Sequence, residues 1–501
     1  MVVLPILLAL TSAQCEASFQ SVMTAVRQND GPKATSLLES LSPDCSHSSS
    51  FYALTGTVDE LTAKTLAAES AFRTAVSLDP KSPSLLEQLG AVYLRNNKPA
   101  DAAVVLRDAV SLDPANQIAK KYLIAAYVGS NNWKPAATLF DEFGKAAFDP
   151  SDPILYLWFT QALAETGQLN RIDREVLPET SRMPPALLFS LGTFFAQHRM
   201  YQRAIKCLGE IPPTSADDAV YFNLGLSHSH LREFDEARKN YYLAIDHHPG
   251  HVDAYFRIGL DYASMGDVRR AIPWLFKAHG GRADRSEITY SLVEQLIQLK
   301  YFQTAQELLS GSEDPSAESL LAVADGDLKQ ATGDSVQAIR SYGKALRGDP
   351  ASAPALVGLA RAEISQGNVK QARSNLNAAL ARDPQDASAN GELGLLDLEE
   401  GDLQSALTNL SKSWAENRSD AVALGLARAY RRLGQPSEAL SVLTSLKPTM
   451  HASPAFHIEL AQVYSALHRL PEAQSERESI TRLEAQNRAG LHFDDPGVYV
   501  H

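Results

Sequence analysis

Small and apolar residues return along the chain at a fixed interval of 33 or 34 positions. Residues 71–80 read AFRTAVSLDP, and residues 105–114 read the similar VLRDAVSLDP. Apolar residues three and four positions apart within each interval indicate amphipathic helices. The alanines that keep this phase are Ala34, Ala68, Ala102, Ala136, Ala204, Ala237, Ala271, Ala305, Ala338, Ala372, Ala406, Ala439 and Ala473. A period of this length predicts a stack of repeated helical units.

Each repeat contains two apolar stretches separated by a turn signal. Small residues that let two helices approach closely recur before the alanines, at Gly56, Gly90, Gly192, Gly225, Gly259, Gly326, Ala360, Gly394, Ala427 and Ala461. Between the stretches, a glycine is followed by Asp or Asn in Gly266-Asp267, Gly333-Asp334, Gly367-Asn368 and Gly401-Asp402. The glycine is predicted to end one helix and the polar residue to cap the next. A proline, as in Asp79-Pro80, then stops the second helix.

The pattern closely resembles that of the tetratricopeptide repeat (TPR) family. In residues 221–249, the residues at the family's signature positions are Tyr221, Leu224, Gly225, Ala237, Tyr241, Ala244 and Pro249. His228 departs from the pattern, because an aromatic residue is usual there. The resemblance covers roughly residues 49–487. It implies an all-α fold, a right-handed superhelical solenoid of about 13 antiparallel helix hairpins.

The repeats divide the chain into segments. TPR units are expected over residues 49–150 and 185–487, where the last unit is followed by a closing helix, and residues 488–501 form a tail. Residues 15–48 are predicted to form a divergent helical hairpin that caps the array. Residues 151–184 fit the pattern poorly, since Asn170 replaces the alanine and Pro178 interrupts the second half. They are either a degenerate unit or a hinge.

The first residues predict export. Val2 to Leu10 are apolar, but the stretch is shorter than the roughly 20 residues that span a bilayer. Small residues follow up to Ala13, which favours a signal peptide over residues 1–13 and a periplasmic or cell-envelope location. A retained first helix would instead indicate a cytoplasmic protein, and a lipid anchor on Cys15 is a further alternative.

The chain contains three cysteines. Cys15 begins the predicted hairpin and Cys45 follows it, so the antiparallel fold brings these residues together. We expect them to form a disulfide in an oxidising compartment; the alternative is three free thiols. Cys207 is expected to be a buried thiol.

Composition narrows the range of functions. The formal net charge is −13, which argues against nucleic-acid binding. The repeats leave no room for a catalytic domain, and the sequence lacks the familiar phosphate-binding, metalloprotease and serine-hydrolase motifs. The histidines between His228 and His251 show no fixed ligand spacing. We therefore expect no catalysis, no metal and no cofactor.

The resemblance implies a ligand groove lined by the first helix of each unit. The fifth position of that helix carries Phe189, Phe222, Phe256 and Tyr290 in consecutive units, a possible ladder of apolar anchors for an extended ligand. The alternative is ordinary packing, because aromatic residues are common there in the family. Asn223 matches a position where an amide holds a peptide backbone in family members.

Arginines gather further along the same predicted face. Arg428, Arg431 and Arg432 share one helix, and Arg361 lies two units earlier. Guanidinium groups could hold a carboxylate or another anion, or they could pair with neighbouring acids. The Lys and Asn set of the family's chaperone-tail carboxylate clamp is incomplete in this sequence.

These features predict a non-catalytic scaffold or assembly factor that binds protein or peptide segments, with no integral membrane span. By resemblance to exported repeat proteins, it is expected in a bacterial envelope. The alternatives are a cytoplasmic adaptor and a non-catalytic subunit of a glycan-processing complex, in which the aromatic residues would stack on sugars. The oligomeric state is left open.

Overall fold

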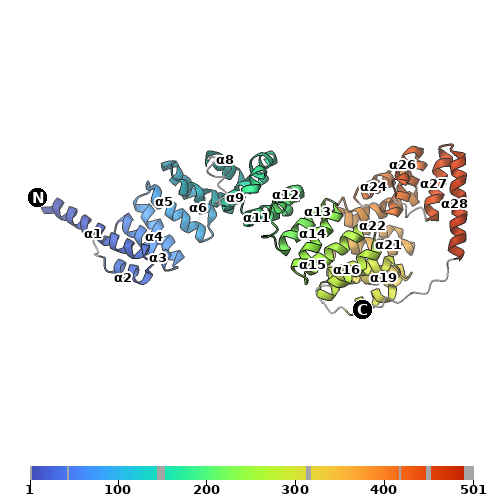
Figure 1. The fold of residues 1–501 in the computed structure, drawn as a ribbon, viewed down its shortest axis with the longest axis horizontal. Coiled ribbons are helices and arrows are strands. Elements are labelled where there is room, and N and C mark those ends of the chain that lie inside the picture. The colour runs from blue at the N-terminus through green and yellow to red at the C-terminus, as the bar shows by residue number, and fades with distance from the viewer. Residues whose placement is uncertain are drawn as a thin grey trace. The chain divides into compact units, whose positions relative to one another are not determined.

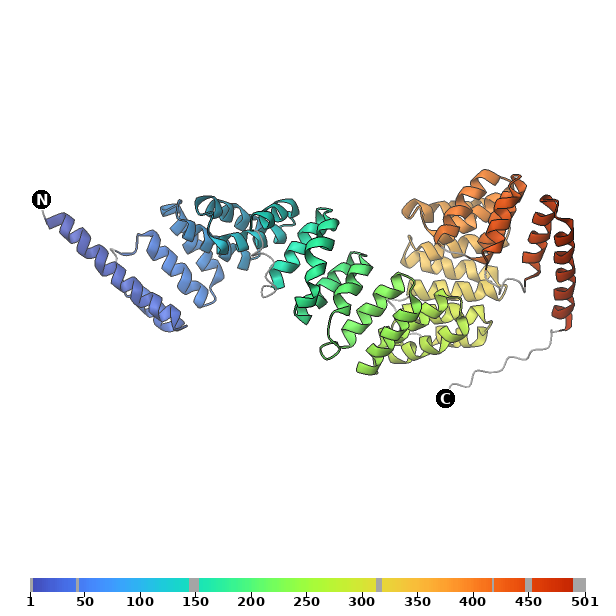
Figure 2. The ribbon, with the colours of Figure 1, turned by 45° about the horizontal axis from the view of Figure 1, so that its top comes forward.

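Helices make up nearly all of the computed structural model, which describes residues 3–41, 45–143, 153–311, 318–416, 419–446 and 453–489. These residues form 28 α-helices and no strand, as the all-α prediction requires (Figure 1). The helices divide into two compact units, the N-terminal unit (Met1–Asn240) and the C-terminal unit (Tyr241–His501). Within each unit, consecutive helices pair as antiparallel hairpins that stack on one another (Figure 2).

The N-terminal unit contains the first thirteen helices. Their bounds are α1 Val3–Arg27, α2 Gly31–Glu39, α3 Ser49–Leu61, α4 Thr65–Leu78, α5 Pro83–Arg95, α6 Pro99–Leu112, α7 Gln117–Gly129, α8 Trp133–Phe143, α9 Pro153–Glu165, α10 Leu169–Arg171, α11 Pro185–Gln197, α12 Tyr201–Gly209 and α13 Asp218–His230. Helix α14 (Phe234–His247) contains the boundary between the units.

The C-terminal unit contains the remaining helices. Their bounds are α15 Val252–Ser264, α16 Val268–Gly281, α17 Ser286–Gln298, α18 Phe302–Ser310, α19 Glu318–Ala331, α20 Ser335–Gly348, α21 Ala353–Ser365, α22 Val369–Arg382, α23 Ala387–Glu400, α24 Leu403–Glu416, α25 Asp420–Arg432, α26 Pro436–Thr444, α27 Pro454–Ala466 and α28 Leu470–Ala489. The predicted closing helix is the last part of α28, which also contains residues 488 and 489 of the predicted tail; the tail from residue 490 onward lies outside the described residues.

The turns at the four predicted glycines follow the predicted chemistry. All four predicted glycines have a positive φ, for example 76° at Gly266 and 88° at Gly401. The carboxylate of Asp334 then accepts a hydrogen bond from the backbone N–H of Gln337 at 3.0 Å, and so caps α20. Asn368 is an exception, because its side chain makes no capping hydrogen bond to α22.

The small sites are where the two helices of a hairpin touch. A Cβ added at Gly90 would lie 2.3 Å from Cγ of Leu106, and one at Gly394 would lie 2.7 Å from Cγ of Leu410. Both leucines stand four residues after a series alanine, and both are fully buried. The period therefore reflects one contact, small residue against large residue, that is repeated from hairpin to hairpin.

The irregular repeat at 151–184 keeps its first helix and loses its second. Helix α9 is followed by the three residues of α10, a π-helical turn at Ile172–Val176 and a 3₁₀ helix at Leu177–Arg182. Ile172 and Val176 are nevertheless fully buried, in one hydrophobic cluster with residues of α9 and α11. The hydrophobic core therefore continues through this segment.

The start of the chain folds as a hairpin of α1 and α2. Its core residues, Val22, Ala25 and Ala34, pack against Leu54 and Val58 of α3. Cys15 and Cys45 are joined by a disulfide, with their Cα atoms 5.6 Å apart. None of the described helices is long and apolar enough to cross a bilayer.

Candidate functional site

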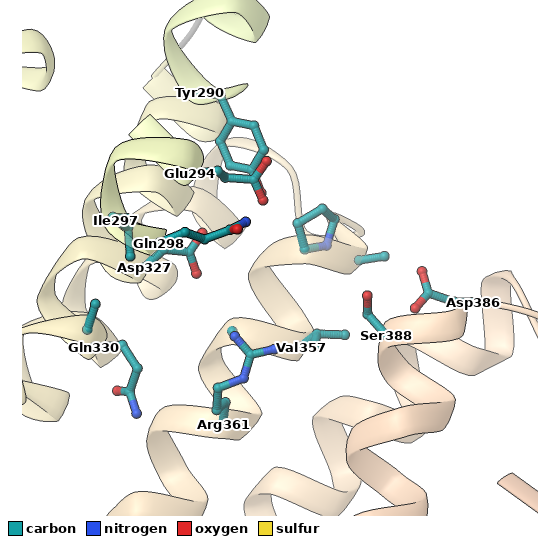
Figure 3. A pocket seen from close by; sticks show the side chains of 14 residues that line it. Tyr290, Glu294, Ile297, Gln298, Asp327, Gln330, Val357, Arg361, Asp386 and Ser388 are labelled. Atoms are coloured by element: carbon teal, nitrogen blue, oxygen red, sulfur yellow. The ribbon is translucent and has the colours of Figure 1, made fainter. Parts of the chain in front are cut away.

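A pocket of about 430 Å³ lies in the C-terminal unit. It is formed by α17, α19, α21 and α23, which are the first helices of four consecutive hairpins. Tyr290 and Glu294 line one side and Asp386 and Ser388 the opposite side, with Asp327 and Arg361 between them (Figure 3). One ligand in this pocket would therefore contact four repeats.

The repeat explains why charged side chains meet here. Glu294, Asp327 and Arg361 each directly follow the residue twelve positions before the alanine of their own unit, which is small at Gly326 and Ala360 and is Val293 in the first of these units. First helices of neighbouring hairpins touch, α17 with α19 and α19 with α21. Equivalent positions therefore line up across the helices, and three charged residues at one position form one wall of the pocket.

Two tyrosines hold the two carboxylates in place. The hydroxyl of Tyr290 donates to Oε1 of Glu294 at 3.2 Å, and that of Tyr342 donates to Oδ1 of Asp327 at 2.7 Å. Tyr342 is fully buried in α20. Its ring reaches Asp327 by passing Gly326 and Gly358, where an added Cβ would lie within 2.5 Å of the ring.

Both carboxylates are costly to ionise. Burial, together with the neighbouring charge of Asp327, raises the pKa of Glu294 to about 7, although the hydrogen bond from Tyr290 acts in the opposite direction. Burial also raises the pKa of Asp327, against the effects of the Tyr342 hydroxyl and the Arg361 charge. The wall therefore carries negative charge that the surrounding protein only partly stabilises.

Arg361 is not available as an isolated cation. Its Nε donates to Oε1 of Glu392 at 2.9 Å, and its side chain is 45% exposed. It lies beside Asp327, which further opposes the approach of an anion. The pocket thus brings together two predicted residues, Tyr290 and Arg361, in an environment that does not suit an anionic ligand.

The predicted aromatic ladder is not a row of equivalent exposed rings. Phe256 is only 7% exposed, packs into the core and lies beneath the guanidinium of Arg285, whose Cζ is 5.9 Å from the ring centre. Phe256 therefore offers little of its surface to a ligand. Of the four rings, Tyr290 is the one that lines the main pocket.

Three other predicted groove residues lie in the N-terminal unit: Phe189, Phe222 and Asn223. Phe189 and Phe222 are half-buried, and Phe189 lines a smaller pocket of about 210 Å³ with residues of α13 and of the segment before it. The Nδ2 of Asn223 donates to the carbonyl of Ala219 in the same helix at 2.8 Å. One donor of the amide predicted to hold a peptide backbone is thus bound within α13.

The other three predicted arginines make contacts inside the C-terminal unit. Arg431 and Arg428 both contact Glu459 of α27, at 2.7 and 3.3 Å, and Glu459 is 1% exposed. The guanidinium of Arg432 donates to the carbonyl of Leu398 at 3.0 Å. Of the two interpretations of this patch, the geometry favours pairing with neighbouring acids over an anion site.

Histidines and cysteines do not form a metal site in the described part of the chain. No group of three His, Cys, Asp or Glu residues there is arranged to hold an ion. Nδ1 of His228 lies 2.7 Å from a carboxylate oxygen of Glu233, and His251 caps α15 through the N–H of Ala254.

Glu294 and Asp327 were missed by the sequence interpretation. Their signal was present, because they occupy the same position of the repeat as Arg361. Charge of either sign at that position of the repeat therefore marks the wall of the pocket.

Comparisons with known proteins agree with the fold. Models of the tetratricopeptide repeat match residues 63–117, 322–391 and 397–457. No curated protein matches the sequence.

Solved structures with similar helical arrangements include yeast Tom70, with 14% identity over 90% of this chain and 99% of that chain and a TM-score of 0.42. A tetratricopeptide repeat protein from Parabacteroides merdae has 14% identity over 48% of this chain and 97% of its own, with a TM-score of 0.42. The Naa15/Naa10 complex bound to HypK-THB has 15% identity over 96% and 85%, with a TM-score of 0.36. The period, the repeated hairpin contact and the matching family models lead to one conclusion: the chain contains tetratricopeptide repeats.

Proposed function

We propose that this protein is a non-catalytic scaffold that binds an extended segment of a partner protein in the pocket of its C-terminal unit. Tetratricopeptide repeats serve as protein-interaction scaffolds. The observation that carries the proposal is a single pocket lined by four consecutive first helices. A ligand that spans several repeats makes many contacts of modest strength, which suits an extended polypeptide.

The pocket has the composition of a recognition site. Its volume of about 430 Å³ falls within the roughly 300–1,000 Å³ typical of ligand pockets. Tyr290, Ile297 and Val357 supply apolar surface, and Glu294, Asp327 and Gln298 supply polar groups. Apolar walls with a few fixed polar groups provide both affinity and orientation.

Photo-crosslinking tests the site of binding. A photoreactive amino acid in place of Gln298, an exposed residue of the pocket, should attach to a partner polypeptide when cells or envelope fractions are irradiated. The same substitution at Arg340, exposed on the second helix α20, should attach to it weakly or not at all. Replacing Tyr290 with alanine should reduce the crosslink at position 298.

Other crosslinking results would count against the proposal. Equal yields at positions 298 and 340 would show that the pocket is not the binding surface. A crosslinked product that carries sugar and no polypeptide would replace the proposal with the glycan alternative.

We further propose that the protein is exported and acts as an assembly factor in the cell envelope. The apolar first segment supports this location, and so does the disulfide between Cys15 and Cys45, since such bonds persist in oxidising compartments.

Thiol counting tests the location. Burial raises the pKa of Cys207 to about 12, so labelling requires acid-trapped protein that is then unfolded and treated with a maleimide. Exported protein that retains Cys15 should take up one label, on Cys207, and its Cys207→Ser variant should take up none. Three labels would indicate a reduced, cytoplasmic protein. Two would indicate cleavage after Cys15, which leaves Cys45 unpaired.

A further inference from the structure

The pocket contains more acidic groups than the chain neutralises. Among the described residues that line it, Glu294, Asp327 and Asp386 are acidic and Arg361 is the one cation. The guanidinium of Arg361 also forms an ion pair with Glu392, so its positive charge is already partly balanced. No lysine, arginine or histidine within the described ranges forms an ion pair with Glu294 or Asp327.

Hydrogen-bond acceptors in the pocket also lack donors. The amide of Gln330 donates from Nε2 to Oγ of Ser365 at 2.9 Å, which leaves its Oε1 on the other side. That oxygen is buried and has no hydrogen-bond partner in the described structure. Glu294 accepts one hydrogen bond, from Tyr290, and Asp327 accepts one, from Tyr342. Because an unpaired buried acceptor is unfavourable, a ligand rich in N–H donors would relieve several deficits at once.

The apolar part of the pocket suits the same kind of ligand. The ring of Tyr290 stands beside Glu294, Ile297 lies on the next turn of α17, and Val357 lines the pocket from α21 (Figure 3). An aromatic ring attracts a cation placed over its face, and aliphatic side chains pack along the stem of a long basic residue. A carboxylate ligand would instead face three carboxyl groups.

We propose that the pocket recognises a basic side chain of the partner segment, with arginine preferred, through Glu294, Asp327 and the ring of Tyr290. The inference rests on the proposed function and adds the chemistry of the ligand to it. Arginine is favoured over lysine because its planar group offers five donors, enough for hydrogen bonds to both carboxylates.

Matched peptide libraries test the proposal. Short randomised peptides carry one fixed central residue, which is arginine, lysine or the uncharged arginine analogue citrulline. Binding to the full-length protein is measured at pH 8, where Glu294 is mostly ionised. The arginine library should bind about tenfold or more tightly than the citrulline library, since a charge-assisted hydrogen bond is lost. The lysine library should fall between them.

Variants locate the preference within the pocket. The double variant Glu294→Gln, Asp327→Asn keeps acceptors for Tyr290 and Tyr342 but loses both charges, and it should lose the preference for arginine. Glu399→Gln, an exposed acid of α23 outside the pocket, is the control and should keep it. Equal binding of the arginine and citrulline libraries, or a preference that survives the double variant, would overturn the inference.

The experiment distinguishes failure of the proposed peptide binding from failure of the proposed recognition of a basic side chain. If the libraries bind without preference for charge, and binding weakens in Tyr290→Ala, the pocket binds peptides and only the basic side chain is refuted. If none of the libraries binds the wild-type protein, peptide recognition itself is contradicted.

Discussion

Replacing both Arg428 and Arg431 with alanine should lower the free energy of unfolding of the C-terminal unit by about 3–5 kcal/mol. Both guanidinium groups contact Glu459, and this carboxylate is 1% exposed in α27. Without them, a buried negative charge loses both of its cationic partners. The loss should appear as faster hydrogen exchange in α25 and α27, because stability in a repeat array is local.

Two further variants identify the cause. Adding Glu459→Gln to the double variant should recover part of the stability, since it removes the buried charge. Arg432→Ala should lower the free energy of unfolding by less, about 1 kcal/mol. Arg432 donates to the backbone carbonyl of Leu398, so its removal leaves no buried charge without a partner. If the double variant were as stable as the wild type but failed to bind a ligand, Arg428 and Arg431 would belong to a binding patch, as the alternative interpretation holds.

The arginine pairs follow a rule that the repeat makes visible. Arg361 pairs with Glu392 and Arg428 with Glu459, and each partner lies 31 residues further along the chain. Arg361 and Arg428 directly follow the small sites of their units, and each glutamate stands two residues before the small site of the next unit. The sequence therefore contained enough information to predict the pairing, had the two positions been compared across neighbouring units.

The fold was predictable because its main contact is periodic. The spacing of Gly90 and Leu106, or of Gly394 and Leu410, recurs in the sequence and corresponds to one contact between two helices. Turns that lack glycine were harder to predict. Asn97 and Asn131 have positive φ values, as the glycines do, yet asparagine occurs in many other settings.

The site was only partly predictable, because exposure is not periodic. Phe256 and Tyr290 hold equivalent positions, yet the first is buried beneath Arg285 and the second lines the pocket. What differs is the set of neighbours that covers each ring. Pro178 predicted an irregular repeat. The π-helical and 3₁₀ turns that replace its second helix could not be predicted, because they depend on tertiary packing.

Replacing Glu294 with glutamine should stabilise the C-terminal unit at pH 8 by up to about 3 kcal/mol. The pKa of Glu294 is raised from 4.5 to about 7, so the folded protein favours the neutral carboxyl group. The stability that this neutral group contributes is fully present below about pH 4.5. The contribution is lost as the pH rises to about 7, because the folded protein must then ionise a buried group. Asp327 on α19 and Tyr290 on α17 are the charged and titratable groups that act on it, and Arg361 on α21 acts in turn on Asp327.

Denaturant unfolding of the wild type and the variant between pH 4 and pH 8 checks this prediction. The free energies of unfolding of the two proteins should be equal at low pH. As the pH rises they should separate, with the glutamine variant more stable than the wild type. Glu399→Gln should follow the wild type throughout, since it removes an exposed charge of the same sign. A glutamine variant that is less stable at pH 8 would mean that the carboxylate stabilises the fold, and the pocket would then hold no unpaired charge for a ligand to neutralise.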